Sequence, residues 1–224
     1  MEPRIQYAKT SDGVSIAYAV FGEGPVIVFP AGIFGDIHLY SAFPVLAQRM
    51  TDELVERGWR VVHYDGRGSG SSDRDASDFS LEGRLRDLEA VIEAVSVDRF
   101  ALCGHMQGGP AAIAYSVRNP DRVSHLILVS TFARGAEYYE ALPSMRVARD
   151  LRQVAEDQWE FFTVTIANAI TAFADSELAR RVAAALRAGM SPKAYLAYRD
   201  IMVEIDITDL LGLVAVPALV VQDR

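Results

Sequence analysis

The residues whose types and spacing best suit catalysis form the stretch GHMQGG at positions 104–109. Gly104 and Gly108 each lie two residues from Met106, the spacing of the turn G-x-nucleophile-x-G, which presents its central residue at a strand-to-helix junction. Small residues on either side of Met106 let the strand and the helix approach each other, and Gly109 leaves further space between them. A thioether has no proton to lose, so a base cannot activate Met106 as it activates serine or cysteine. The pattern predicts the turn and excludes ordinary acyl-enzyme chemistry at its tip.

Two backbone amides are expected to face this turn and to bind a negatively charged oxygen. The N–H of Gln107 would lie at the N-terminus of the following helix, where the helix dipole favours negative charge. The second amide is expected from the loop AGIFG, at Ile33. His105 can donate a proton there, but a lone histidine is more often a packing or loop-orienting residue, and no carboxylate within the motif orients it.

An apolar stripe at helical spacing is the candidate lining of a ligand pocket. It consists of Trp159, Phe162, Ile166, Ile170 and Phe173. The alternative is that the stripe packs a helical layer on the rest of the protein, and both roles can hold at once. The residues predicted to line the pocket are Phe34, His105, Trp159, Phe162 and Ile166. The acidic side chain in YDGRG, Asp65, is expected to bind loop amides and the nearby Arg67 rather than to act as an acid.

Short apolar strands alternating with helices must position these residues. Buried strands are predicted at PVIVFP, RVVHYD, RFALCG and SHLILVS, after a hairpin around SDG, and the strand pattern resumes at VPALVV. One helix is expected within 43–57 and another after Ser80, whose charges in LEGRLRDLEAVIEAV should form a solvated face. Helical periodicity then dominates until VPALVV, with serine caps at Ser176 and Ser191. This order predicts an α/β fold with a mostly parallel sheet and helices on both faces.

The same pattern predicts three segments along the chain. Residues 1–132 should form the core, 133–212 a helical cap or lid, and 213–224 a return to the core as a strand.

The motifs resemble those of the alpha/beta-hydrolase superfamily. VIVFPAG looks like its oxyanion strand and loop, VVHYDGRGSGSSDR like its D-x-R-G-x-G-x-S loop, and LCGHMQGGPAAIAYSVRNPDRVSHLILVS like its nucleophile elbow, helix and next strand. TSDGVSIAYAVFGEGP and STFARG are similar to the subgroup found beside nucleotide-cyclase or helix-turn-helix regulatory domains. The resemblance implies cofactor-independent hydrolysis of ester or related bonds, by a Ser, Asp or Cys nucleophile with a later acid and a histidine near the C-terminus.

This sequence departs from the family pattern at all three catalytic positions. Met106 replaces the nucleophile, Asp223 lies short of the usual place of the acid, and the last histidine is His125. We therefore expect no intact triad and an inactive or impaired hydrolase, a pseudoenzyme, in a chain that is C-terminally truncated. Two alternatives stay open: a non-catalytic small-molecule sensor that uses the cap-covered pocket, and an incomplete gene product that associates through an unpaired sheet edge. Met106 is then a harmless replacement, a polarizable floor for a hydrophobic ligand, or an introduced residue.

Composition limits the partners. The net charge of −8 and the pI near 5.0 disfavour nucleic acid. Cys103 is the only cysteine, which excludes an internal disulfide and fits the cytoplasm. No apolar run approaches the roughly 20 residues of a membrane span. We expect a partly hydrophobic small molecule as the ligand or substrate, with no membrane, metal or cofactor.

Overall fold

A seven-stranded sheet forms the centre of the protein. The structure, a computed structural model, describes residues 4–33, 37, 48–171 and 173–222. In these ranges the strand order is β1-β2-β4-β3-β5-β6-β7. The strands are β1 (Gln6–Lys9), β2 (Ser15–Phe21), β3 (Val26–Phe29), β4 (Arg60–Tyr64), β5 (Phe100–His105), β6 (Val123–Val129) and β7 (Ala218–Val221). The hairpin β1-β2 is antiparallel, as is β2 with β4, and the other neighbours are parallel. The predicted mostly parallel sheet is confirmed.

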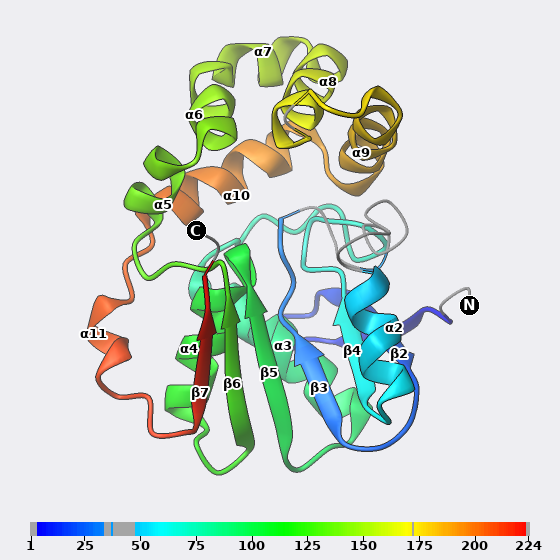
Figure 1. Cartoon of the computed structure of the whole chain (residues 1–224), viewed down its shortest axis with the longest axis vertical. Helices are drawn as coiled ribbons and strands as arrows, with labels where there is room; N and C mark the ends of the chain where they lie inside the picture. The colour runs from blue at the N-terminus through cyan, green and yellow to red at the C-terminus, as the bar shows by residue number, and fades with distance from the viewer. Residues whose placement is uncertain (1–3, 34–36, 38–47, 172, 223–224) are drawn as a thin grey trace.

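Helices cover both faces of this sheet because alternate strand residues point to opposite sides. In β2, Ile16 and Tyr18 pack toward α3 (Leu81–Val95) and α4 (Gly109–Arg118), whereas Ala17 packs toward α2 (Arg49–Glu56). Figure 1 shows α2 on the opposite side of the sheet from α3 and α4. Of the helix predicted within 43–57, only the part from residue 48 is described. Ser80 caps α3 as predicted, since its hydroxyl accepts from the N–H of Gly83.

A layer of helices lies beyond the ends to which the parallel strand arrows point (Figure 1). This helical layer comprises α5 (Gly135–Ala141), α6 (Pro143–Asp150), α7 (Arg152–Asp157), α8 (Trp159–Ile170), α9 (Ser176–Gly189) and α10 (Pro192–Glu204). It has an apolar core of its own. Two backbone hydrogen bonds join its two ends, from Gly135 N to the Ile205 carbonyl and from Ile207 N to the Ala133 carbonyl. A third, from Gly70 N to the Gly189 carbonyl, fastens α9 to the loop after β4.

Two details of the helical layer correct the sequence prediction. Asp175, not Ser176, caps α9, because its carboxylate accepts from the N–H groups of both Glu177 and Leu178. The apolar stripe does not reach Phe173, because α8 ends at Ile170 and Phe173 lies beyond it with φ +58° and 74% exposure. The cap predicted at Ser191 is confirmed by its bond from Ala194 N.

The last strand lies at one edge of the sheet. After the short helix α11 (Thr208–Leu211), β7 pairs with β6, and in the described ranges no strand lies on its other side. Its four side chains are exposed, with Val220 at 67%. Association through this edge remains a prediction. None of the helices in the described ranges has the length and apolar character needed to cross a membrane.

One buried histidine should make the stability of the core depend on pH. His63, in β4, stacks on Phe29 with ring centroids 4.7 Å apart, and its Nε2 lies 2.9 Å from Thr51 Oγ1. Burial lowers the pKa of His63 from 6.5 to about 4, so the folded protein favours the neutral ring. The stabilisation is therefore present above pH 6.5 and lost as the pH falls toward 4, by at most roughly 3 kcal/mol.

The variant His63→Gln isolates this effect. Urea unfolding at several pH values should give a free energy that falls less steeply with acid in the variant than in the wild type. Parallel curves for the two proteins across this interval would show that His63 does not titrate on unfolding.

Candidate functional site

The turn after β5 places Met106 at a strained tip. β5 ends at His105, a 3₁₀ turn spans Met106–Gly108, and α4 follows. Met106 has φ +45°, in the left-handed backbone region that residues other than glycine avoid. Its side chain is 37% exposed. The turn therefore has the backbone of a nucleophile elbow, with a partly exposed residue at its tip.

The three glycines of this elbow (residues 104–109) have no room for a side chain. A Cβ at Gly104 would lie 2.7 Å from Gly109 Cα, and one at Gly108 would lie 2.3 Å from the carbonyl oxygen of Pro30. At Gly109 it would meet Thr131 Oγ1 at 1.8 Å. Gly109 was expected only to relax the packing, but it is required as strictly as the other two because Thr131 occupies the space.

Thr131 is a site residue that sequence reasoning missed. Its hydroxyl donates to the carbonyl of Met106 at 2.6 Å. That carbonyl belongs to the same peptide unit as the N–H of Gln107, so Thr131 fixes the orientation of the predicted oxyanion donor. Its position after β6, beside β5, could have signalled this role, since functional residues gather at the carboxyl ends of parallel strands.

Arg84 was also missed, and it joins the elbow to the loop after β3. It was counted among the solvated charges of α3, but it is only 5% exposed. Its Nη2 donates to the carbonyls of both Ala31 and Gln107. On its other side Nη1 contacts the sulfur of Met202 at 3.3 Å, and the guanidinium lies 5.5 Å from the ring centroid of Tyr198. A single cation thus connects both halves of the predicted oxyanion site to α10.

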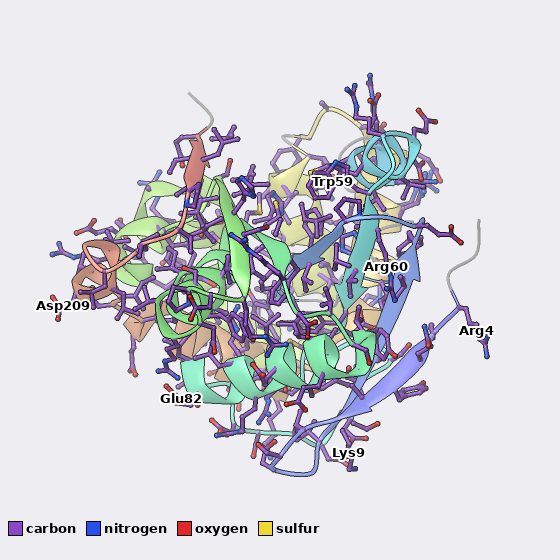
Figure 2. The ribbon with its side chains drawn as sticks, turned by 90° about the horizontal axis from the view of Figure 1, so that it is seen from below. Arg4, Lys9, Trp59, Arg60, Glu82 and Asp209 are labelled. Atoms are coloured by element: carbon purple, nitrogen blue, oxygen red, sulfur yellow. The ribbon has the colours of Figure 1, made fainter. Side chains whose placement is uncertain are left out.

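Only part of the charge on α3 faces solvent as predicted. Figure 2, seen from below, shows Glu82 on the outer side of this helix, whereas Arg84 and Asp87 are buried. Asp87 binds Arg67, with 3.0 Å between Arg67 Nε and Asp87 Oδ1. The buried side of α3 is therefore charged as well as apolar.

The loop after β4 is organised by two buried acids. Asp65 accepts from the backbone N–H groups of Ile37 and Ser71, at 3.0 and 2.8 Å, which agrees with the predicted role toward loop amides. The other half of that prediction was a bond to Arg67. In the described ranges Arg67 forms ion pairs with Asp87, Asp12 and Asp78. Asp12 comes from the N-terminal hairpin, a partner that local sequence does not reveal.

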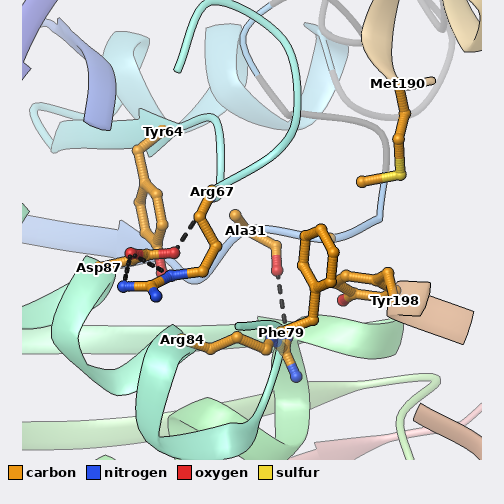
Figure 3. A pocket seen from close by; sticks show the side chains of 10 residues that line it. Ala31, Tyr64, Arg67, Phe79, Arg84, Asp87, Met190 and Tyr198 are labelled. Carbon is orange, nitrogen blue, oxygen red and sulfur yellow. Dashed lines mark hydrogen bonds and ion pairs between the residues drawn. The ribbon is translucent and has the colours of Figure 1, made fainter. Parts of the chain in front are cut away.

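A small cavity lies behind the loop after β3. Figure 3 shows Arg84 directed toward Ala31 on one wall and Phe79, Tyr198 and Met190 on another. Its volume is about 10 Å³, which is room for one water molecule. It is too small for an organic ligand, and both charged and apolar side chains line it.

The residues predicted to supply the oxyanion amides and to line the pocket divide into two groups. Ile33 is half-buried and packs against the core of the helical layer, and His105 is half-buried at the end of β5. Phe162 and Ile166 are 1% and 2% exposed inside the helical layer, where Trp159 stacks on Phe162 with centroids 5.4 Å apart. Phe34 lies outside the described residues. The structure thus places Ile33, His105 and Gln107 near the strand ends, and the α8 residues in the interior of the layer above.

Neither a reactive thiol nor a metal-binding cluster is found among the described residues. Burial raises the pKa of the Cys103 thiol to about 12, so the sulfur stays protonated. Among the described residues, no group of three or more His, Cys, Asp and Glu side chains could hold a metal ion.

Comparison with known proteins matches these features to a family. The family model described as alpha/beta hydrolase fold matches residues 25–222, which include the whole elbow and both neighbouring loops. The chain belongs to the alpha/beta hydrolase family. Among curated relatives, a 2-hydroxy-6-oxononadienedioate/2-hydroxy-6-oxononatrienedioate hydrolase of Klebsiella pneumoniae is 32% identical over 144 residues, or 63% of this chain and 44% of the relative. The chain spans about half the length of the curated relatives it matches.

Solved alpha/beta hydrolase structures share the fold at low identity. An esterase from Rhodococcus sp. ECU1013 superposes with a TM-score of 0.78 at 20% identity, over 98% of this chain and 80% of that one. A bromoperoxidase from Bacillus anthracis superposes at 0.77 with 19% identity, over 97% of this chain and 80% of that one. The different activities of these two proteins show that the fold alone does not identify a reaction.

Proposed function

We propose that this alpha/beta hydrolase chain does not form an acyl-enzyme at its elbow and is hydrolytically inactive or strongly impaired. The observation that carries the proposal is Met106 itself, exposed at the tip of the turn with φ +45°. Its sulfur occupies the place from which this family's nucleophile attacks, and it has no proton for a base to remove. The relative from Klebsiella pneumoniae is named as a hydrolase, which supports a small-molecule site in this fold but not turnover here.

Aryl esters test the proposal directly. With p-nitrophenyl acetate and butyrate, the chain should release p-nitrophenol no faster than a heat-denatured sample does. The variant Met106→Ser should also give no burst of acylation, because a serine needs a base, and the last histidine of this chain is His125, exposed in β6. Turnover well above the denatured control that disappears in Met106→Ala would overturn the proposal.

A second candidate function is small-molecule binding without turnover, as in a sensor. The observation in its favour is the retained elbow: a left-handed non-glycine residue costs about 1–3 kcal/mol and persists only where its surroundings hold it. Here the backbone of Pro30 and the side chain of Thr131 leave no room for a Cβ at Gly108 and Gly109, so the elbow is closely packed. In this proposal residues 133–212 act as a cap over a core formed by 1–132 and 213–224. Stabilisation by a ligand in a thermal melt, without turnover, would support it.

The cytoplasmic location expected from the lone cysteine remains part of this proposal. It agrees with the high pKa of Cys103, since a buried and protonated thiol forms no disulfide.

A further inference from the structure

A groove between the N-terminal hairpin, α3 and the end of α4 is large enough for a small ligand. Its volume is about 260 Å³. Its walls are formed by Lys9 and Ser11 of the hairpin, by one side of α3 from Glu82 to Glu93, and by the last turns of α4. Typical small-ligand pockets enclose roughly 300–1,000 Å³, so this groove suits a ligand at the small end of that range.

This groove is separate from the elbow. Arg118, which lines it, is the last residue of α4, whereas the elbow ends at Gly109, the first residue of that helix. The two residues lie roughly 14 Å apart along the helix axis. Figure 2 shows Lys9 on the hairpin beside α3, whose outer side carries Glu82. A ligand in the groove would therefore occupy a second site, at the far end of α4 from the elbow.

The floor of the groove is apolar. It consists of the buried side chains of Leu85 and Ala90 and the ring of Tyr115. The hydroxyl of Tyr115 accepts from Arg122 Nη1 at 3.3 Å, which fixes the ring in place. An aliphatic group that packed on this floor would be removed from water, which favours binding.

Most of the charged groups around the groove already have partners within the protein. The ion pairs are Glu82 with Arg118, Glu89 with Arg122, and Arg86 with both Asp12 and Asp78. Each of these charges is balanced by its neighbour, so none of them calls for a ligand.

Two charges of opposite sign remain. Lys9 is the last residue of β1 and Glu93 lies in the last turn of α3, and in the described ranges neither forms an ion pair. Burial raises the pKa of Tyr115, and the carboxylates of Glu89 and Glu93 add to that rise, so Glu93 lies near the floor. The groove thus offers one cation and one anion on different walls, above an apolar floor.

We propose that this groove binds an apolar α-amino acid in its zwitterionic form, with the carboxylate at Lys9 and the ammonium group at Glu93. The aliphatic side chain of the ligand packs on the floor. Each charge of the ligand meets the opposite charge, and the ammonium group donates to the carboxylate of Glu93. Because exposed ion pairs are weak, both are needed, and we expect a dissociation constant of about 1–10 mM.

Three ligands with the same carbon skeleton separate the two charges. L-Leucine carries both, N-acetyl-L-leucine lacks the ammonium group, and L-leucinamide lacks the carboxylate. Each is titrated at pH 7 into the full 224-residue chain, and binding is followed by ligand-observed NMR. L-Leucine should bind at least about fivefold more tightly than either analogue, because only the zwitterion can meet both charged side chains.

Two neutral variants assign each charge of the ligand to its partner. In Lys9→Gln, L-leucine should bind no more tightly than L-leucinamide does, because the carboxylate has lost its partner. In Glu93→Gln, L-leucine should likewise lose its advantage over N-acetyl-L-leucine. Both side chains are exposed and outside any ion pair in the described ranges, so the variants should melt at the wild-type temperature.

The matched controls are exposed residues of the same types outside the groove. Lys193, on α10, is the other lysine of the chain, and Glu156 lies on α7. Lys193→Gln and Glu156→Gln should bind L-leucine as the wild type does. The proposal would be overturned by equal binding of the three ligands, by no binding of L-leucine at about 50 mM, or by an unchanged preference for L-leucine in Lys9→Gln. An equal loss of affinity in Lys193→Gln would also refute it, because binding would then depend on net charge and not on this groove.

Discussion

Replacing Gly108 with alanine should destabilise the protein by about 2–3 kcal/mol, the cost of forcing an extra methyl group into a closed space. The new Cβ would lie 2.3 Å from the carbonyl oxygen of Pro30. That oxygen belongs to the backbone directly after β3, a buried central strand, and Gly108 directly precedes the buried helix α4. Moving either backbone would disturb the packing of the core. The variant should also move the loop after β3 away from the elbow.

Gly212 provides a control with nearly the same backbone. Gly108 has φ −72° and ψ −22°, and Gly212 has φ −71° and ψ −10°, but a Cβ at Gly212 would meet nothing within 4 Å. Because alanine restricts the unfolded chain, Gly212→Ala should leave the stability unchanged or raise it by up to about 1 kcal/mol. Urea unfolding of the two variants measures the difference. Similar effects at both positions would mean that the contact with Pro30 is not tight.

These two glycines illustrate what local sequence can predict. The spacing of Gly104, Met106 and Gly108 predicted a strand-to-helix turn, and apolar runs predicted the strands on either side, because both signals lie within a few residues. The contact that makes Gly108 irreplaceable comes from Pro30, far back in the chain. Spacing therefore predicts that a small residue is needed, but only the fold shows which atom excludes a larger one.

The buried charges of α3 were unpredictable for a related reason. Helical periodicity assigns charged residues to solvent, which is correct for Glu82 and wrong for Arg84 and Asp87. Arg84 is satisfied by backbone carbonyls of two loops, which carry no side-chain signal in the sequence. Long-range polar contacts thus decide the parts of the site that the motif does not name.

The second large effect is expected from Asp87→Asn, which should cost about 3–5 kcal/mol because it leaves a buried guanidinium without its full counter-charge. Arg67 and Asp87 each have a side chain 2% exposed, and Arg67 Nη2 lies 2.9 Å from Asp87 Oδ1. The second carboxylate oxygen accepts from the backbone N–H of Arg67 at 3.1 Å. Asp12 also pairs with Arg67, but its side chain is 32% exposed. Water therefore screens its attraction to Arg67, and Asp12 cannot replace the lost charge of Asp87.

An exposed ion pair on the same helix gives the matched control. Glu82 pairs with Arg118, and their side chains are 57% and 50% exposed, so Glu82→Gln should change the free energy of unfolding by less than about 1 kcal/mol. Replacing both buried partners, as in Arg67→Met with Asp87→Leu, should recover much of the loss, because no unpaired charge then remains inside. Urea unfolding of the single, double and control variants tests all three expectations. If Asp87→Asn cost no more than Glu82→Gln, the other contacts of the loop after β4, such as the amide bonds of Asp65, would have to hold it without the Arg67–Asp87 pair.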